Sequence, residues 1–270
     1  MFTKSISPGS PRNGLSKVPE VTIYFWVIKI LATTVGETAA DYVNFTLGLG
    51  LKSTTAATVI LLLTALVVQF AESRYIPAVY WWTVLLISVT GTLITDNLTD
   101  NLGVPLTIST TFFAGALVLV FCAWYFTERT LSIHSIRTRG REAFYWLAIL
   151  VTFALGTAAG DLVAEQLALG YMTSLVVFGA LIVVVIAAHF VLHLNAVVAF
   201  WSAYILTRPL GASLGDLLTQ PRDVGGLGVG TTVTNAVFLL VIVGMVGYLS
   251  VTHVDRTEQN DAASLAPIRR

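Results

Sequence analysis

The chain consists mainly of long apolar runs separated by short polar or glycine-containing segments. Residues 56–70 and 175–188, for example, contain no charged side chain. A helix needs about 20 mainly apolar residues to cross the hydrocarbon core of a membrane. The strict alternation that marks a transmembrane β-barrel strand is absent from these runs. The pattern therefore predicts an all-α, polytopic membrane helix bundle.

The pattern occurs in four copies along the chain. Each copy carries an aromatic–Trp pair, a Gly 10 residues after the Trp and an Asp 15 residues after it. The four sets are Trp26, Gly36 and Asp41; Trp81, Gly91 and Asp96; Trp146, Gly156 and Asp161; and Trp201, Gly211 and Asp216. Each copy is long enough for two spanning helices, the first of which begins near the Trp and ends near the Asp. We therefore expect eight transmembrane helices, arranged as four parallel two-helix repeats.

The boundaries of the repeats follow from the spacing and from the polar segments. The Trp residues of copies two and three lie ten residues farther apart than the others, which places a linker between these copies. In each copy, Ser and Thr residues after a Gly-containing break, such as Ser53 and Thr54, are expected to cap the second helix. The predicted order is a flexible cytoplasmic tail (1–16), repeats (17–73 and 74–127), a basic linker (128–142), repeats (143–194 and 195–252) and a second flexible cytoplasmic tail (253–270).

Composition excludes several classes of protein. Only 11% of the residues are charged, whereas soluble domains have about 25%. The formal net charge of zero disfavours nucleic-acid binding, and the one cysteine excludes an internal disulfide or a cysteine-rich metal site. Eleven Lys and Arg residues lie on the side of both termini and two, Lys52 and Arg222, on the other. This asymmetry predicts a multi-pass protein of the inner (plasma) membrane with cytoplasmic N and C termini.

Four tandem units with two membrane helices and a signature tryptophan each resemble the bacterial membrane-protein family called "repeat of unknown function 347". The resemblance covers about residues 17–252, and Trp26, Trp81, Trp146 and Trp201 match the signature position. It implies the membrane topology and a bacterial origin. It implies no activity and no catalytic residue.

The repeated Asp residues are the main candidates for a function. At about 1.5 Å of rise per residue, each Asp lies about 22 Å from its Trp, so all four share one depth and can meet around a common axis. Three copies hold a second carboxylate four residues away, in the pairs Glu37/Asp41, Asp96/Asp100 and Asp161/Glu165, and Gln220 takes this place in the fourth. Adjacent ionised carboxylates repel each other unless a cation bridges them or one is protonated. We therefore predict a cation or proton site, with the same carboxylates as ligands of a hard divalent metal. The alternative is that each Asp is structural and closes a turn.

Two basic residues lie within the predicted spans, Lys29 in copy one and Arg208 in copy four. These copies are neighbours in a closed ring, so both side chains are candidates for a gate or a counter-charge to the acidic residues. The alternative is that they snorkel towards the interface. We expect the four repeat Gly residues to allow close helix packing and the four Trp residues to anchor the helices at the interface.

The sequence thus predicts a small secondary transporter or channel for a cation, either a hard divalent metal or a proton. The alternative is a non-transporting membrane scaffold or sensor. No catalytic motif is present, so we expect no enzyme activity. We expect no cofactor besides a bound or transported divalent cation. The expected partners are the lipid bilayer and the small cation, with no nucleic acid. The oligomeric state is left open between a monomer and a homo-oligomer.

Overall fold

A computed structural model describes residues 16–256, and all regular structure in this part of the chain is helical. The eight α-helices are α1 (Ile23–Asp41), α2 (Leu51–Ala71), α3 (Pro77–Asp96), α4 (Leu106–Glu128), α5 (Arg139–Asp161), α6 (Gly170–Val191), α7 (Ala196–Thr219) and α8 (Thr231–Thr252). Three π-helical turns extend α1, α3 and α5, namely η1 (Tyr42–Thr46), η2 (Asn97–Asn101) and η4 (Leu162–Gln166). Two short 3₁₀ turns, η3 (Ile133–Ser135) and η5 (Arg222–Val224), lie in connections.

Seven of these eight helices are long and apolar enough to cross a membrane. The remaining helix, α7, is long enough as well, but Arg208 near its middle lowers its hydropathy. The multi-pass character expected from the sequence is therefore present in the fold.

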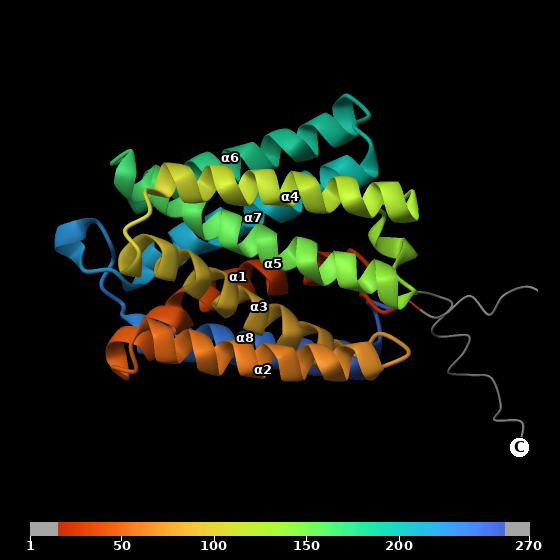
Figure 1. Cartoon of the computed structure of the whole chain (residues 1–270), viewed down its shortest axis with the longest axis horizontal. Helices are drawn as coiled ribbons and strands as arrows, with labels where there is room; N and C mark the ends of the chain where they lie inside the picture. Colours follow the sequence, from red (N-terminus) through yellow and green to blue (C-terminus); the bar gives the residue numbers. More distant parts are fainter. Residues whose placement is uncertain (1–15, 257–270) are drawn as a thin grey trace, which may run out of the picture.

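The helices form an inner group and an outer group (Figure 1). The first helix of each copy (α1, α3, α5 and α7) is largely buried, whereas α2, α4, α6 and α8 are largely exposed. Each outer helix packs on the inner helix of the next copy: α2 on α3, α4 on α5, α6 on α7 and α8 on α1. The pairing of α8 with α1 closes the ring.

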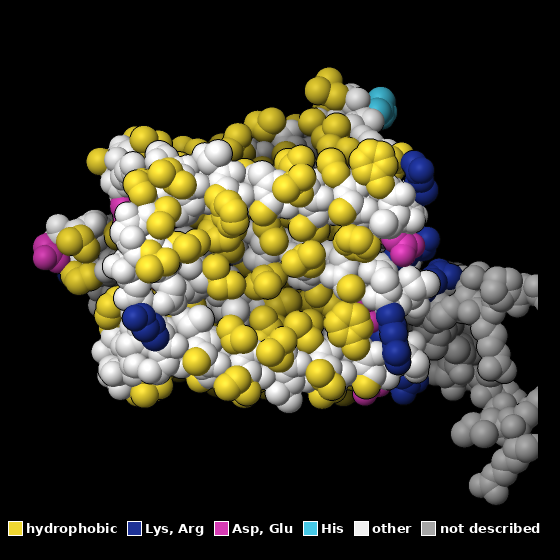
Figure 2. Space-filling model, viewed as in Figure 1, with side chains coloured by type: hydrophobic (Ala, Val, Ile, Leu, Met, Phe, Trp, Pro, Cys, Tyr) yellow, Lys and Arg dark blue, Asp and Glu magenta, His cyan; other side chains and the backbone are white. Residues whose placement is uncertain are grey.

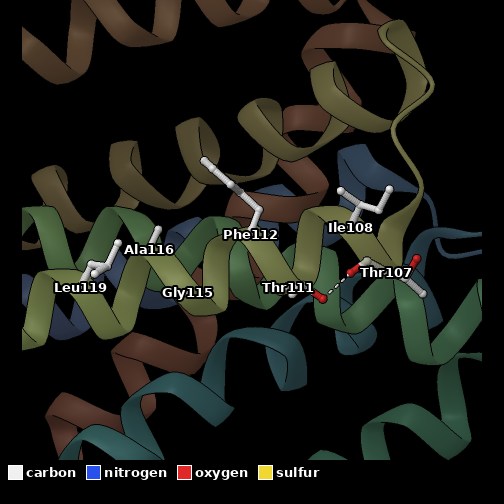
Figure 3. A pocket seen from close by; sticks show the side chains of 7 residues that line it. All are labelled: Thr107, Ile108, Thr111, Phe112, Gly115, Ala116 and Leu119. Atoms are coloured by element: carbon white, nitrogen blue, oxygen red, sulfur yellow. Dashed lines mark hydrogen bonds between the residues drawn. The ribbon is translucent and has the colours of Figure 1, made fainter.

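The exposed surface has the character expected for contact with lipid. On the face shown in Figure 2, apolar side chains cover the middle of the molecule, and most of the visible Lys and Arg side chains lie at one end. One face of α4 forms a shallow hollow, lined by residues of this helix alone and without an ionisable side chain (Figure 3). Ile108, Phe112 and Leu119 are exposed on this face.

The repeat glycines hold the inner ring together. Each one faces the side chain located seven residues after the Trp of the next copy, so a methyl group at the glycine would overlap this side chain. The four contacts are Gly36 with Ser88, Gly91 with Phe153, Gly156 with Arg208, and Gly211 with Thr33. The expected role of these glycines in close helix packing is confirmed.

The repeat tryptophans form a second ring at the end where the inner helices begin. The aromatic residue before each Trp contacts the Trp of the next copy, with ring centroids 5.5 Å apart for Phe25–Trp81, 5.4 Å for Tyr80–Trp146, 6.2 Å for Tyr145–Trp201 and 5.8 Å for Phe200–Trp26. Trp81, Trp146 and Trp201 are at most 5% exposed. For these three residues the predicted role as interfacial anchors is wrong, because they fill the space between helices, whereas Trp26 is half-buried.

The connection that contains most of the predicted linker, and residues 253–256 of the predicted second tail, form hydrogen bonds with the helical part of the molecule. The connection between α4 and α5 spans residues 129–138, and the indole of Trp201 donates a hydrogen bond to its Leu131 carbonyl at 2.9 Å. Residues 253–256 do not behave as a flexible tail, because the hydroxyl of Tyr75 donates to the buried Asp255 carboxylate at 2.6 Å. The other tail residues, 1–15 and 257–270, lie outside the described part of the chain.

Candidate functional site

All seven predicted carboxylates line one cavity. It lies where the inner helices end and has a volume of about 210 Å³. The lining residues are Glu37, Asp41, Phe45, Asp96, Thr99, Asp100, Leu106, Asp161, Glu165, Asp216 and Gln220. The four copies of the repeat therefore contribute to a single site, because the inner helices run in the same direction and end at one level.

The carboxylates differ in depth. Glu37 is buried, the four repeat Asp residues range from buried (Asp216) to half-buried, and Asp100 and Glu165 are exposed at the rim. The π-helical turns begin directly after Asp41, Asp96 and Asp161, at the level of this cavity. π-Helical turns are rare and often occur at functional sites.

The repeat Asp carboxylates have no partner within the described part of the chain. None of the four accepts a hydrogen bond or forms an ion pair there. A carboxylate that closes a turn would accept a hydrogen bond from backbone amides. The geometry thus disfavours the purely structural interpretation of these residues and leaves their oxygens facing the cavity.

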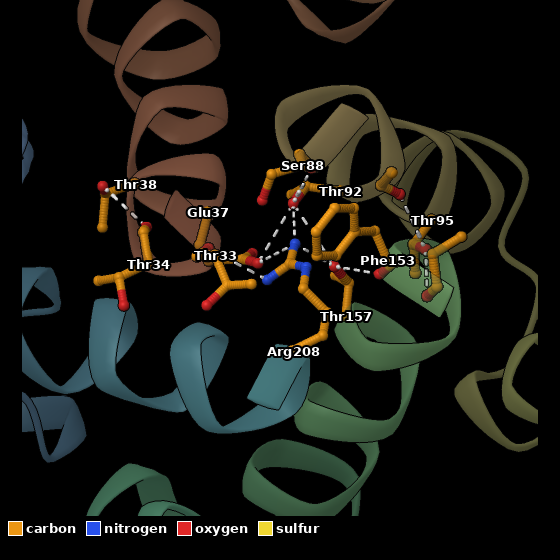
Figure 4. Close-up of polar contacts among 12 residues, drawn as sticks. Thr33, Thr34, Glu37, Thr38, Ser88, Thr92, Thr95, Phe153, Thr157 and Arg208 are labelled. Carbon is orange, nitrogen blue, oxygen red and sulfur yellow. Dashed lines mark hydrogen bonds and ion pairs between the residues drawn. The ribbon is translucent and has the colours of Figure 1, made fainter. Parts of the chain in front are cut away.

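Arg208 contacts Glu37, which lines the cavity, and joins the four inner helices (Figure 4). Its Nη2 lies 3.0 Å from Oε2 of Glu37 on α1 and donates to the hydroxyls of Thr92 on α3 and, at 2.7 Å, of Thr157 on α5. Its Nη1 donates to the Thr33 carbonyl at 3.4 Å. The side chain is fully buried, so Arg208 is placed as a counter-charge to Glu37 and does not snorkel.

Lys29 lies below Arg208 and is also fully buried. Its Nζ donates to the Tyr204 carbonyl at 3.0 Å and to the Thr207 hydroxyl at 2.6 Å, and it lies 3.7 Å from the centre of the Tyr204 ring. The ring of Phe153 is 5.1 Å away. Lys29 therefore does not snorkel, and no carboxylate of the described residues pairs with it.

The carboxylates do not form a ready metal site. No group of three His, Cys, Asp or Glu side chains between residues 16 and 256 is compact enough to hold a metal ion. The cavity volume leaves room for water between the carboxylates. The carboxylates therefore suit a hydrated cation or protons in this conformation, and the predicted direct ligation of a divalent metal requires them to move closer together.

A family model described as Repeat of Unknown Function (DUF347) matches residues 24–75, 79–130, 144–194 and 199–255. The chain belongs to this family. Comparison with curated proteins and with solved structures gave no match. The four DUF347 repeats agree with the four copies in the sequence, and each contributes its Asp to the cavity.

The inner helices of the four DUF347 repeats share a four-residue spacing of inward-facing side chains. Counted from the residue before each Trp, every fourth position of an inner helix belongs to one buried column, since residues four apart share a helix face. On α1 the column contains Phe25, Lys29, Thr33, Glu37 and Asp41. The same count on α7 places Arg208 at the level of Thr33, and this spacing could have located it in the sequence.

Proposed function

We propose that this protein carries a cation across the membrane and binds it in the carboxylate-lined cavity. The cation is a proton or a hydrated hard divalent ion such as Mg²⁺, Mn²⁺ or Ca²⁺. The observation that carries the proposal is the cavity itself, in which seven carboxylates from four repeats meet, while the four repeat Asp side chains have no partner among the described residues. Intramembrane carboxylates that face a cavity are typical of ion and proton pathways.

The proposed topology places this cavity on the side opposite the cytoplasm. All eight helices cross the inner membrane as four parallel repeats, with α7 shielded from lipid by its neighbours. Lys and Arg gather where the inner helices begin, which supports cytoplasmic termini. The cavity then opens outwards, and the aromatic ring around Trp81, Trp146 and Trp201 closes the cytoplasmic end. This arrangement supports a carrier in an outward-open state more than an open channel.

Ligand-dependent stability of the purified protein tests the cavity. A cation at about 100 times its Kd adds about 2.7 kcal/mol to the free energy of unfolding. Melting is measured across Mg²⁺, Mn²⁺, Ca²⁺ and pH for the wild type and for Asp41→Asn, Asp96→Asn, Asp161→Asn and Asp216→Asn. Asn keeps the shape of Asp but removes its charge, so each variant should fold and lose most of the stabilisation.

The four variants should differ in a defined order. Asp96 and Asp161 have carboxylate neighbours at Asp100 and Glu165, whereas the neighbour of Asp216 is Gln220. We therefore expect Asp216→Asn to lose the most. Asp223→Asn changes a carboxylate outside the cavity and serves as the control. Equal unfolding of all four variants, or no effect of any variant on the response to cations and pH, would favour the scaffold or sensor.

A further inference from the structure

From the column below the cavity, we infer that the transported cation is the proton and that the buried amine of Lys29 receives and releases it on its way across the membrane. This inference rests on the proposed function and names its substrate. It concerns a residue that the cavity does not contain.

The layers of Arg208 and Lys29, which follow the cavity, disfavour the passage of a metal ion. Arg208 spans the space between the inner helices, with contacts to Glu37 of α1, Thr92 of α3 and Thr157 of α5. Lys29 follows one layer below, at Tyr204 and Thr207. A metal ion leaving the cavity would have to pass the guanidinium of Arg208 and the amine of Lys29 without its water shell. A fixed positive charge in a narrow pore, such as that of an Arg, excludes cations. A proton passes such a layer only where a titratable group takes it up, and the amine of Lys29 is such a group.

The surroundings of Lys29 differ from those of Arg208. Arg208 has the Glu37 carboxylate as its counter-charge. Lys29 has a carbonyl, a hydroxyl and aromatic rings, and the charged or titratable groups that face it are Arg208 and Tyr204, both on α7. A buried charge without a counter-charge is unfavourable. An amine can avoid this by releasing its proton, which a guanidinium cannot do in proteins.

The layers of α1 provide the route. Asp41, Glu37, Thr33 and Lys29 follow one another four residues apart, about 6 Å per step along the helix. The buried hydroxyl of Ser88 lies at the level of Thr33 and has no hydrogen-bond partner between residues 16 and 256. A proton held by a cavity carboxylic acid passes to the neutral amine, which gives a carboxylate and an ammonium. In a conformation open to the cytoplasm, the ammonium then releases the proton to water and returns to the neutral amine.

Proteoliposomes with an internal pH dye or an internal Mn²⁺ dye test the inference under an imposed potential. The variants are Lys29→Met, which has no proton to exchange, and Lys29→Arg, which keeps the charge but does not release the proton. Lys52→Met, at an exposed position of α2, is the control. We expect proton entry for the wild type and the control, at least a tenfold loss for both Lys29 variants, and no Mn²⁺ entry. The cation- or pH-dependent stabilisation of the cavity should persist in both variants.

Several results would overturn the inference. Proton flux in Lys29→Arg at the wild-type rate would show that only the fixed charge is needed, and Mn²⁺ entry would show that the column admits a metal ion. Either result leaves the proposed cavity site intact. If neither cations nor pH change the stability of the wild type, both the proposed function and this inference are wrong. If Lys29→Arg does not fold, Thr207→Val replaces it, because it removes one hydrogen-bond acceptor of Nζ. An unchanged pH profile of proton flux in Thr207→Val contradicts the inference.

Discussion

Two ion pairs near the same end of the molecule differ strongly in burial. Nζ of Lys17 lies 2.5 Å from Oε2 of Glu142, and both side chains are at most 7% exposed. Gln69 also donates to Glu142, at 3.1 Å. The second pair, Arg141–Glu128, has a distance of 2.7 Å and side chains that are at least 25% exposed. Burial, and not distance, should therefore set what each pair contributes to stability.

We expect Lys17→Met to lower the free energy of unfolding by about 3–5 kcal/mol, because it leaves the Glu142 carboxylate buried without a counter-charge. Glu128→Gln, which breaks the less buried pair, should cost about 1 kcal/mol or less. Chemical denaturation in detergent measures both. A smaller loss for Lys17→Met than for Glu128→Gln would contradict the importance of the buried pair.

At the scale of elements, the fixed spacing of Trp, Gly and Asp predicted where the inner helices lie, although α5 begins at Arg139, inside the predicted linker (128–142). Helices α1, α3, α5 and α7 each contain their Trp and their Asp. The expected Ser and Thr caps of the outer helices are wrong, since Gly50 and Gly230 precede α2 and α8 with φ of 74° and 83° and no side-chain cap bond forms. Glycine adopts these positive φ values without strain.

The π-helical turns after Asp41, Asp96 and Asp161 were not predicted either. A π-turn is a shift of backbone hydrogen bonds by one residue, as from the Leu47 amide to the Tyr42 carbonyl at 2.9 Å, and no residue type marks it. The cavity residues could be named from sequence because charge within an apolar run is conspicuous. Their depth and the contacts of Arg208 could not be predicted, because both depend on how the inner helices pack.

The glycine contacts of the inner ring give a prediction at this scale. In Gly91→Ala, the new methyl group would lie 2.7 Å from Cβ of Phe153 and 3.1 Å from the backbone nitrogen of Ala154, so α3 and α5 must separate. Overpacking of this kind costs about 1–3 kcal/mol. Gly115→Ala on the outer helix α4 meets nothing within 4 Å and should leave stability unchanged or slightly raised. Thermal melting of the two variants measures the difference, and equal effects would contradict the ring packing.

At the scale of the whole molecule, the central claim is a carboxylate cavity that opens to the outside and is sealed from the cytoplasm. One end of the inner ring holds the acidic cavity, and the other is closed by aromatic side chains around Tyr80 and Tyr145, whose hydroxyls lie 2.5 Å apart. Arg208 and Lys29 separate these ends. A molecule of this form has two sides with different accessibility, which chemical labelling can distinguish.

Labelling of single cysteines in cells tests this claim most directly. In a Cys122→Ser background, Thr99→Cys places a thiol in the cavity and Arg139→Cys places one at the start of α5. With a membrane-impermeant thiol reagent, we predict that Thr99→Cys reacts in intact cells and is protected by the bound cation. Arg139→Cys should react only after the membrane is permeabilised. Labelling of Arg139→Cys in intact cells, with Thr99→Cys reacting only after permeabilisation, would contradict the account.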